Sequence, residues 1–164
     1  MTICQSCQLW SRLQDVDREE IRGIARRART CFSALSSNTG KCVRTVCPPV
    51  RACDQFVISE TAALAVTDFL SGYGISAKIK WPNDIYIGDK KICGILVEHS
   101  IRGEWLSNSI IGIGLNINQR NFDVNLPNPT SMALCTSGSY DIRKCLDEFM
   151  TIFTAYLERY LNIT

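Results

Sequence analysis

The stretch KIKWPNDIYIGDKKICGILVE, residues 78–98, joins a strand pattern to a cluster of charged side chains. Apolar and polar residues alternate from Ile75 to Trp81, which is typical of a strand with one buried face. Pro82 cannot donate a hydrogen bond to a ladder, so we expect this strand to end there. Residues 85–98 then have the pattern of a hairpin with its turn at Gly88. The stretch therefore predicts an antiparallel sheet.

The segments on either side complete the pattern of an α+β domain. Residues 105–116 predict a further strand, which makes a meander of four strands. Residues 56–70 predict a helix with Ser59 as its N-cap and Gly72 just beyond its end. Residues 141–161 carry apolar side chains at helical spacing and predict a second helix that packs against the sheet. The predicted fold class is α+β, with a mixed or antiparallel sheet packed against helices.

The composition limits the class of protein. The chain has 164 residues, of which 46% are hydrophobic, so it is long enough for one domain with a substantial core. No run approaches the roughly 20 apolar residues of a membrane helix, and the first residues lack the features of a secretion signal. A formal net charge of +2 is too small to indicate a nucleic-acid binder. We therefore expect a cytoplasmic protein whose partners are neither nucleic acid nor membrane.

The first third of the chain differs from the rest. Residues 1–53 carry nine Lys or Arg against four Asp or Glu, a net charge of +5, and six of the nine cysteines. Apolar periodicity is weak before about residue 50, so we predict an atypical basic, Cys-rich segment over residues 1–47 and a regular core over residues 48–164. Without an export signal, reduced thiols are favoured over disulfides. The alternative is zinc held by four thiols, Cys4, Cys7, Cys42 and Cys47. Three later cysteines are expected in the core: Cys93, Cys135 and Cys145.

A group of charges surrounds the predicted turn after Lys80. If the hairpin folds back, Lys80 can point toward the same mouth as Lys90 and Lys91, with Asp84 between them. Such a group suits a bound anion and a magnesium ion, because lysines neutralise phosphate or carboxylate charge and hard oxygens hold the metal. The alternative is a plain strand-ending turn beside solvated lysines.

Glycines interrupt the two longest predicted strands. Gly94 lies within an apolar run, and Gly112 and Gly114 lie within IGIGLNIN. The latter is not a dinucleotide fingerprint, because Ile117 stands where a third glycine is needed and no βαβ unit surrounds it. A glycine inside a strand marks a bulge or a close approach by a ligand. We therefore expect a flat ligand to lie on the sheet here.

Three motifs, in this order, resemble the catalytic core of biotin protein ligases in the bacterial form without a DNA-binding domain. They are Lys-Trp-Pro-Asn-Asp at 80–84, Lys-x-x-Gly-Ile-Leu-Val-Glu at 91–98 and Gly-x-Gly-x-Asn at 112–116. The resemblance covers roughly residues 50–161 and implies the class II synthetase-like fold of biotin and lipoate ligases. It also implies ATP-dependent ligation of biotin, through biotinyl-5'-AMP, to a lysine of a biotin carboxyl carrier domain of a carboxylase. The implied ligands are ATP, biotin and Mg²⁺.

The resemblance also implies roles for individual residues. Lys91 and Lys80 would be catalytic, with Lys91 on the biotin and acyl-phosphate oxygens. The nucleotide would contact Asn83, Asp84 and Asn116, and Asp84 and Asn116 would hold the metal. Substrate would further be bound by Gly94, Ile95, Leu96, Trp81, Gly112 and Gly114. A homodimer is left open.

Two parts of the family pattern are missing. The family carries a Ser-Thr-Asn segment and a glycine-rich Arg loop before the core, whereas the basic stretch at 22–29 has a single glycine. The small C-terminal β-barrel of the family also does not follow residue 161, so we expect an incomplete fold. One hypothesis is that residues 1–47 derive from a shifted reading frame and supply no strand to the sheet. The sheet edge would then be open to pairing or aggregation.

Two alternatives to an active biotin ligase stay open. One is a non-catalytic protein that retains a biotin or adenylate pocket on the same fold. The other is a lipoate ligase-like protein, although the Lys-Trp-Pro-Asn-Asp block favours biotin.

Overall fold

The computed structural model describes residues 39–46 and 50–161, and of residues 39–46 it describes the backbone only. Five strands form one sheet in the order β1-β5-β4-β3-β2, and all neighbouring strands are antiparallel. The strands are β1 (Thr39–Val46), β2 (Lys78–Lys80), β3 (Asp84–Ile87), β4 (Lys90–Arg102) and β5 (Trp105–Asn116). The helices are a 3-10 turn (Ala52–Asp54), α3 (Phe56–Gly72), α4 (Met132–Thr136) and α5 (Ile142–Leu161). The predicted α+β class and the meander from β2 to β5 are confirmed.

The beginning of the meander differs from the prediction. Ile75 is buried, but β2 has only three residues and ends at Lys80. Trp81 is the first residue of the turn and is 69% exposed, so its predicted place on the buried face is wrong. The reason is that the turn at Pro82 starts one residue earlier than the alternation suggests, and the ring leaves the sheet with it.

Strand β1 contradicts the prediction that residues 1–47 supply no strand. It pairs with β5 from Thr39 opposite Asn116 to Val46 opposite Ser109. The edge of β5 is therefore covered, and the predicted open edge at this position is wrong. The stretch at 22–29 and Cys4, Cys7 and Cys47 lie outside the described residues, as does the side chain of Cys42, so the zinc alternative stays a prediction.

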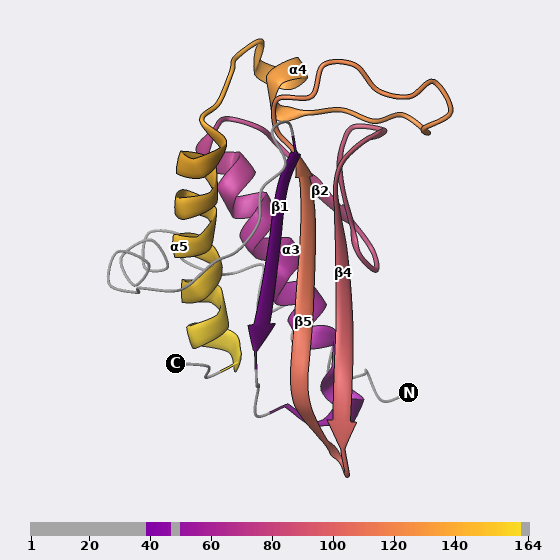
Figure 1. Cartoon of the computed structure of the whole chain (residues 1–164), viewed down its shortest axis with the longest axis vertical. Coiled ribbons are helices and arrows are strands. Elements are labelled where there is room, and N and C mark those ends of the chain that lie inside the picture. The colour runs from indigo at the N-terminus through magenta and orange to yellow at the C-terminus, as the bar shows by residue number, and fades with distance from the viewer. Residues whose placement is uncertain (1–38, 47–49, 162–164) are drawn as a thin grey trace.

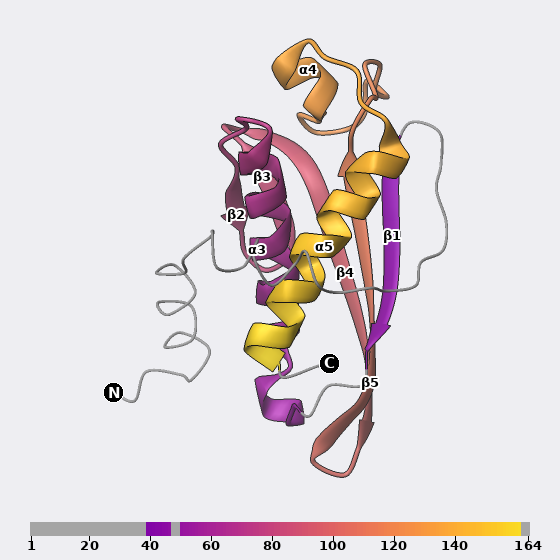
Figure 2. The same cartoon turned by 90° about the vertical axis from the view of Figure 1, so that its left-hand side faces the viewer.

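Within residues 39–46 and 50–161, two helices cover one face of the sheet and no helix covers the other. Figure 2 shows α3 and α5 on the same side of the strands, and Figure 1 shows α3 passing behind them. The N-cap of α3 is Gln55, so the prediction of Ser59 is wrong and Ser59 lies within the helix. Gly72 is the last helical residue rather than the first beyond it, and the chain turns at Gly74, whose φ is +73°. We call the two sides of the sheet the covered face and the open face.

The core lies between the covered face and the two helices. Helix α5 packs mainly on α3, with a smaller contact to β1, so its predicted packing on the sheet is only part of its role. Phe149 meets Phe69 edge to face with ring centroids 5.9 Å apart and stacks on Phe153 at 5.5 Å. Cys93 and Cys145 are buried as predicted, but Cys135 is exposed on α4, a short helix that the sequence pattern did not predict. Within the described part of the chain, no helix has the length and apolarity to cross a membrane.

Candidate active site

A row of residues crosses the open face of the sheet with very little side-chain bulk. Gly94 of β4 lies opposite Asp84 of β3 on one side and Gly114 of β5 on the other. Lys80 of β2 lies opposite Asp84 and continues the row. Side chains of paired residues leave the sheet on the same face. The charged residues of β2 and β3 therefore lie beside a floor of two glycines.

An ion pair stands on this floor. The Lys91 Nζ atom lies 2.6 Å from Asp84 Oδ1, and the two side chains are 40% and 26% exposed. A Cβ atom added at Gly94 would lie 3.5 Å from Lys91 Cε, 3.6 Å from Lys91 Nζ and 3.8 Å from Asp84 Oδ1. The Lys91 side chain therefore lies over Gly94, and because Gly94 has no side chain, there is room for the Lys91–Asp84 ion pair.

A β-bulge explains why Lys91 reaches the open face. Strict alternation would place Lys91 on the same face as Cys93, which is buried. However, Cys93 lies opposite Ile85 and Lys91 lies opposite Tyr86, so Ile92 is an extra residue in β4. Ile92 and Cys93 are both buried, and this places Lys91 on the side of Gly94. A bulge re-aims side chains in this way next to functional sites.

The other lysines of the predicted cluster occupy two different places. The Lys80 Nζ atom lies 4.8 Å from the centroid of the Tyr86 ring, a cation–π distance. Lys90 is exposed where β4 begins and has no ion pair within the described residues, so its predicted place in the cluster is wrong. Adjacent residues of a strand leave it on opposite sides, and only Lys91 can join Asp84.

A second row extends the floor away from the charges. Gly112 lies opposite Leu96, and a Cβ atom at Gly112 would lie 3.6 Å from the Leu96 carbonyl oxygen. Leu96 is 63% exposed, so this part of the open face is apolar. Ile95 is buried on the covered face, which means that its side chain cannot line a ligand on the open face as predicted.

The turn between β2 and β3 lies at the edge of the sheet, and its first residue contacts α3. The Trp81 ring lies 6.1 Å from the ring of Phe56, a half-exposed residue of α3 that sequence reasoning missed. Asn83 is exposed, and its carbonyl accepts a 2.8 Å hydrogen bond from the Ile95 N–H. This bond ties the turn to β4.

The side chain of Asn116, at the end of β5, makes a hydrogen bond within the protein. Its side-chain Nδ2 donates to the carbonyl of Thr130 at 3.0 Å. Thr130 belongs to the long loop between β5 and α4, at the upper right of Figure 1. This bond uses one of the two N–H donors of the amide, and the oxygen of the same side chain is an acceptor suited to a ligand or metal. No signal in the sequence pairs these two residues.

Other titratable groups near the site give no catalytic constellation. Burial raises the pKa of the Cys93 thiol to about 12, so it stays protonated on the covered face and is no nucleophile at neutral pH. Among residues 39–46 and 50–161, no three His, Cys, Asp or Glu side chains gather as metal ligands. The hard side-chain oxygens predicted to bind the metal are those of Asp84 and Asn116.

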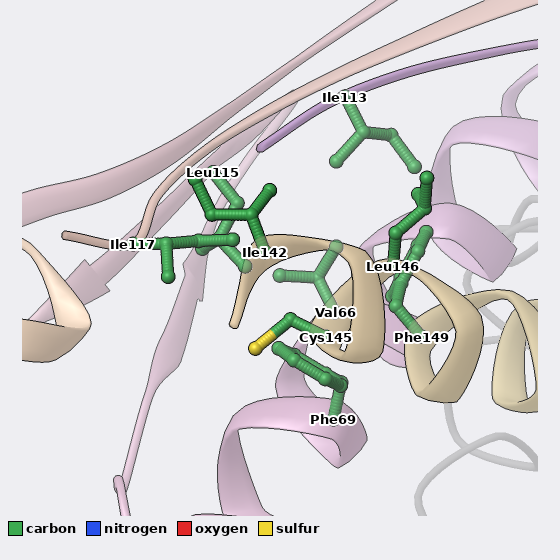
Figure 3. Close-up of a pocket in the computed structure, with 9 residues that line it drawn as sticks. All are labelled: Val66, Phe69, Ile113, Leu115, Ile117, Ile142, Cys145, Leu146 and Phe149. Atoms are coloured by element: carbon green, nitrogen blue, oxygen red, sulfur yellow. The ribbon is translucent and has the colours of Figure 1, made fainter. Parts of the chain in front are cut away.

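An apolar hollow with a volume of about 20 Å³ lies between the covered face and helices α3 and α5 (Figure 3). It is lined by residues of α3, of β5 and the position just after it, and of α5, namely Val66, Phe69, Ile113, Leu115, Ile117, Ile142, Cys145, Leu146 and Phe149. These side chains provide no group that could bind an anion. The hollow is lined by apolar side chains, and the candidate site is therefore placed on the open face.

Part of the chain matches a known protein family. Residues 45–116, which contain every site residue named above from Trp81 to Asn116, match the Biotin/lipoate A/B protein ligase family. The match covers less than half of the chain and includes all three sequence motifs. A Bifunctional ligase/repressor BirA from Bacillus spizizenii is 46% identical over 63 residues, which are 38% of this chain and 19% of that protein. A Biotin--[acetyl-CoA-carboxylase] ligase from Paracoccus denitrificans is 34% identical over 103 residues, 61% of this chain and 42% of that protein. The chain spans less than half the length of these relatives.

The fold also has solved structural neighbours. The apo biotin protein ligase of Aquifex aeolicus superposes with a TM-score of 0.68 at 20% identity, over 90% of this chain and 67% of that chain. The lipoate complex of P. falciparum LipL1 gives 0.53 at 14% identity, over 73% of this chain and 35% of that chain. At these identities the likeness concerns the fold alone. It confirms the fold class implied by the resemblance.

Proposed function

We propose that the chain carries the catalytic site of a biotin protein ligase. In the first step, the biotin carboxylate attacks the α-phosphorus of ATP, the bond to pyrophosphate breaks, and biotinyl-5'-AMP forms. In the second step, a lysine amine of a carrier domain attacks the biotinyl carbonyl and AMP leaves. The name of the relative from Paracoccus, a Biotin--[acetyl-CoA-carboxylase] ligase, supports biotin as the substrate and a carboxylase as the source of the carrier.

The observation that carries this proposal is the Lys91–Asp84 ion pair on the floor made by Gly94. The first step brings two anions together, and a fixed cation at the point of contact offsets their repulsion. The ammonium group of Lys91 is partly exposed and already directed onto the open face. We infer that it donates hydrogen bonds to the biotin carboxylate and to the α-phosphate oxygens. Lys80 adds a second positive charge at the edge of the same row.

The apolar part of the open face suits the rest of the ligand. Gly94, Gly112 and Gly114 present backbone without side chains, so a flat ring system can approach the sheet closely. Leu96 and Trp81 are exposed and would gain by covering apolar ligand surface. We assign the biotin rings to this area and the phosphates to the charged end of the row.

The nucleotide end contains the polar residues Asn83, Asp84 and Asn116. Mg²⁺ is usually bound in proteins through one or two carboxylates together with substrate phosphates and water. The carboxylate of Asp84 and the side-chain oxygen of Asn116 fit that pattern, but the described residues do not form a complete cage. We therefore propose that Mg²⁺ enters as the ATP complex and that Asp84 and Asn116 bind it from the protein side. Bound there, the ion supplies charge neutralisation at the phosphates.

The test uses the full chain with biotin, MgATP and an apo biotin carboxyl carrier domain. Biotin-dependent exchange of pyrophosphate into ATP measures the first step, and mass spectrometry of the carrier lysine measures the second. The proposal predicts both signals with biotin and neither with lipoate. Biotin binding without exchange would identify the non-catalytic alternative, and exchange with lipoate alone would identify the lipoate ligase alternative. The predictions of a cytoplasmic location and a homodimer need separate measurements.

A further inference from the structure

The loop between β5 and α4 returns to the sheet beside Lys91. The β4–β5 ladder runs as far as Cys93 opposite Leu115, and beyond this pair the place next to β4 is taken by residues 128–130. The Lys91 N–H donates to the Asn128 carbonyl at 2.8 Å, and the Thr130 N–H donates to the Lys91 carbonyl at 2.9 Å. This is one bridge of a parallel ladder, with Lys91 opposite Pro129. We call residues 128–130 the strap.

The strap is itself held by the rest of the fold. Thr130 is buried, and its carbonyl accepts the hydrogen bond from Asn116 Nδ2 at 3.0 Å. The next residue, Ser131, is buried, donates from Oγ to the Gln119 carbonyl at 2.5 Å and caps α4 by accepting from the Leu134 N–H at 3.2 Å. The strap therefore connects the ends of β4 and β5 through bonds that do not depend on a ligand.

The strap bonds to β4 at the same residue where the β3–β4 ladder is interrupted by a β-bulge. On its other side, Lys91 faces β3 at the bulge, where the register slips between Ile85 and Tyr86. A bulge leaves the ladder locally disrupted and lets the backbone bend. The two bonds from the strap are made to the same residue that the bulge re-aims. The direction of the Lys91 side chain thus depends on the bulge and on the strap together.

Asn128 is the residue on which the geometry of the strap depends. Its φ is +46°, in the left-handed region where Asn is tolerated and β-branched residues are strained. Its side chain is exposed, so the backbone conformation is what a substitution there would disturb. A residue that leaves the left-handed region would move the carbonyl that accepts from Lys91.

We propose that the strap is a positioning element that fixes Lys91 over Gly94, with Asn128 as its positioning residue. The proposal rests on the proposed function in so far as Lys91 is the cation that meets the reacting anions. It assigns to Asn116 a second task, that of holding the strap through Thr130. It adds Asn128, for which the sequence motifs gave no role.

The experiment compares three variants of the full chain. Asn128→Val forces a β-branched residue into the left-handed region, whereas Asn128→Gly accepts that region without strain. Asn121→Val is the matched control, because it makes the same side-chain change at an exposed position of the same loop, outside the strap. Brief acetylation with acetic anhydride and peptide mass spectrometry then measure the reactivity of Lys91 relative to Lys144, whose side chain is 74% exposed on α5.

We expect Asn128→Val to release Lys91 from Asp84 and to raise its relative acetylation several-fold, while Asn128→Gly and Asn121→Val match the parent chain. Where biotin-dependent pyrophosphate exchange is present, Asn128→Val should lower kcat by roughly 10-fold or more, because small misplacements of a reacting group are costly. The KM for biotin should change less than kcat. Unchanged Lys91 acetylation and unchanged kcat in a folded Asn128→Val chain would overturn the proposal.

Two provisions keep this result separate from that of the proposed function. If the parent chain shows no exchange activity, the proposed function fails, yet the acetylation ratio still tests the strap. If Asn128→Val does not fold, amide hydrogen exchange of the parent chain decides instead. The Lys91 amide should then be protected to the same degree as the Ile95 amide, which donates to Asn83. Rapid exchange at Lys91 alone would show that the strap does not hold it.

Discussion

Successive residues of strands β4 and β5 point to opposite faces of the sheet, and the two faces differ in burial, side-chain size and charge. On the covered face, Ile95, Ile111 and Ile113 are at most 4% exposed and pack against the helices. On the open face, their neighbours are Gly94, Gly112 and Leu96, of which the only large side chain is exposed. The covered face stabilises the fold, whereas the open face carries glycines, exposed apolar side chains such as Leu96 and Ile110, and a charged edge.

This difference indicates that the site depends on the covered face for its rigidity and contributes little to stability itself. Glycines in the interior of a strand weaken it by their conformational freedom, so three of them in two strands require compensation. Burial of the isoleucines of the same strands on the covered face offsets this destabilisation. Substitutions on the two faces should therefore separate into effects on folding and effects on activity.

The largest effect is expected from truncation on the covered face. Ile111 is fully buried in the core, and Ile111→Ala should lower the free energy of unfolding by about 2–5 kcal/mol, through lost transfer energy and the cavity left behind. Leu96→Ala on the open face is the control and should change stability by no more than about 0.5 kcal/mol. Urea unfolding followed by circular dichroism measures both. Equal losses in the two variants would contradict the division of labour between the faces.

The next effect is expected on activity alone. Lys91→Ala should leave the unfolding midpoint nearly unchanged, because this side chain packs on a glycine, but should lower the rate of biotinyl-5'-AMP formation by ~100-fold or more. Lys90→Ala is the matched control, since that lysine is exposed and lies outside the ion pair. Single-turnover adenylation with both variants makes the comparison. A rate for Lys91→Ala equal to that of Lys90→Ala would remove Lys91 from the mechanism.

The difference between the two faces was largely predictable from the sequence. Within residues 92–98 and 105–116, alternate residues of each strand point to opposite faces, which is a property of neighbouring residues. The glycines inserted in that pattern predicted the ligand-binding face for the same reason. The hairpin pattern predicted Lys91 beside Asp84 but did not separate it from Lys90, because the bulge at Ile92 decides which lysine lies on the open face. Two successive apolar residues, Ile92 and Cys93, were the single local sign of that bulge.

Other features depend on contacts between distant segments, which periodicity does not report. Strand β1 was missed because its stretch has no clear alternation, and its pairing with β5 joins residues far apart in the chain. The strap was missed because a loop rich in Asn and Pro gives no sign of where it returns to the sheet. Trp81 was assigned to the buried face of the strand because of its position in the alternation, and the turn that begins there leaves it 69% exposed.

A smaller effect is expected at the carboxylate of the ion pair. Asp84→Asn keeps the shape of the side chain but removes the anionic oxygen that both Lys91 and the magnesium–ATP complex would use. We expect the KM for MgATP to rise roughly 10-fold, the scale of one hydrogen bond to a charged group. The KM for biotin should rise less. Equal changes in the two constants would indicate that Asp84 acts only by holding Lys91.

The smallest effect concerns a polar pair on the covered face, which tests whether that face acts through apolar packing alone. His99, the single histidine of the chain, lies opposite Ser109, and its Nδ1 is 2.8 Å from the Ser109 Oγ. Ser109 is fully buried, and burial lowers the pKa of His99 below its ordinary value of 6.5. Between the lowered folded pKa and 6.5, the unfolded chain binds more protons than the folded one. The contribution of His99 to stability is therefore complete above pH 6.5 and decreases as the pH falls through that window.

The variant His99→Gln isolates this contribution, because glutamine can bond to Ser109 but does not titrate near neutral pH. Thermal unfolding of both proteins from about pH 8 to about pH 5 spans the window in which histidine changes charge. Carboxylates that titrate at the lower end affect both proteins alike, so the difference between their midpoints reports His99. We expect the parent chain to lose more stability than the variant on acidification. Parallel curves would show that proton binding at His99 does not oppose folding, and that the hairpin end of the covered face is open enough to accommodate the charge.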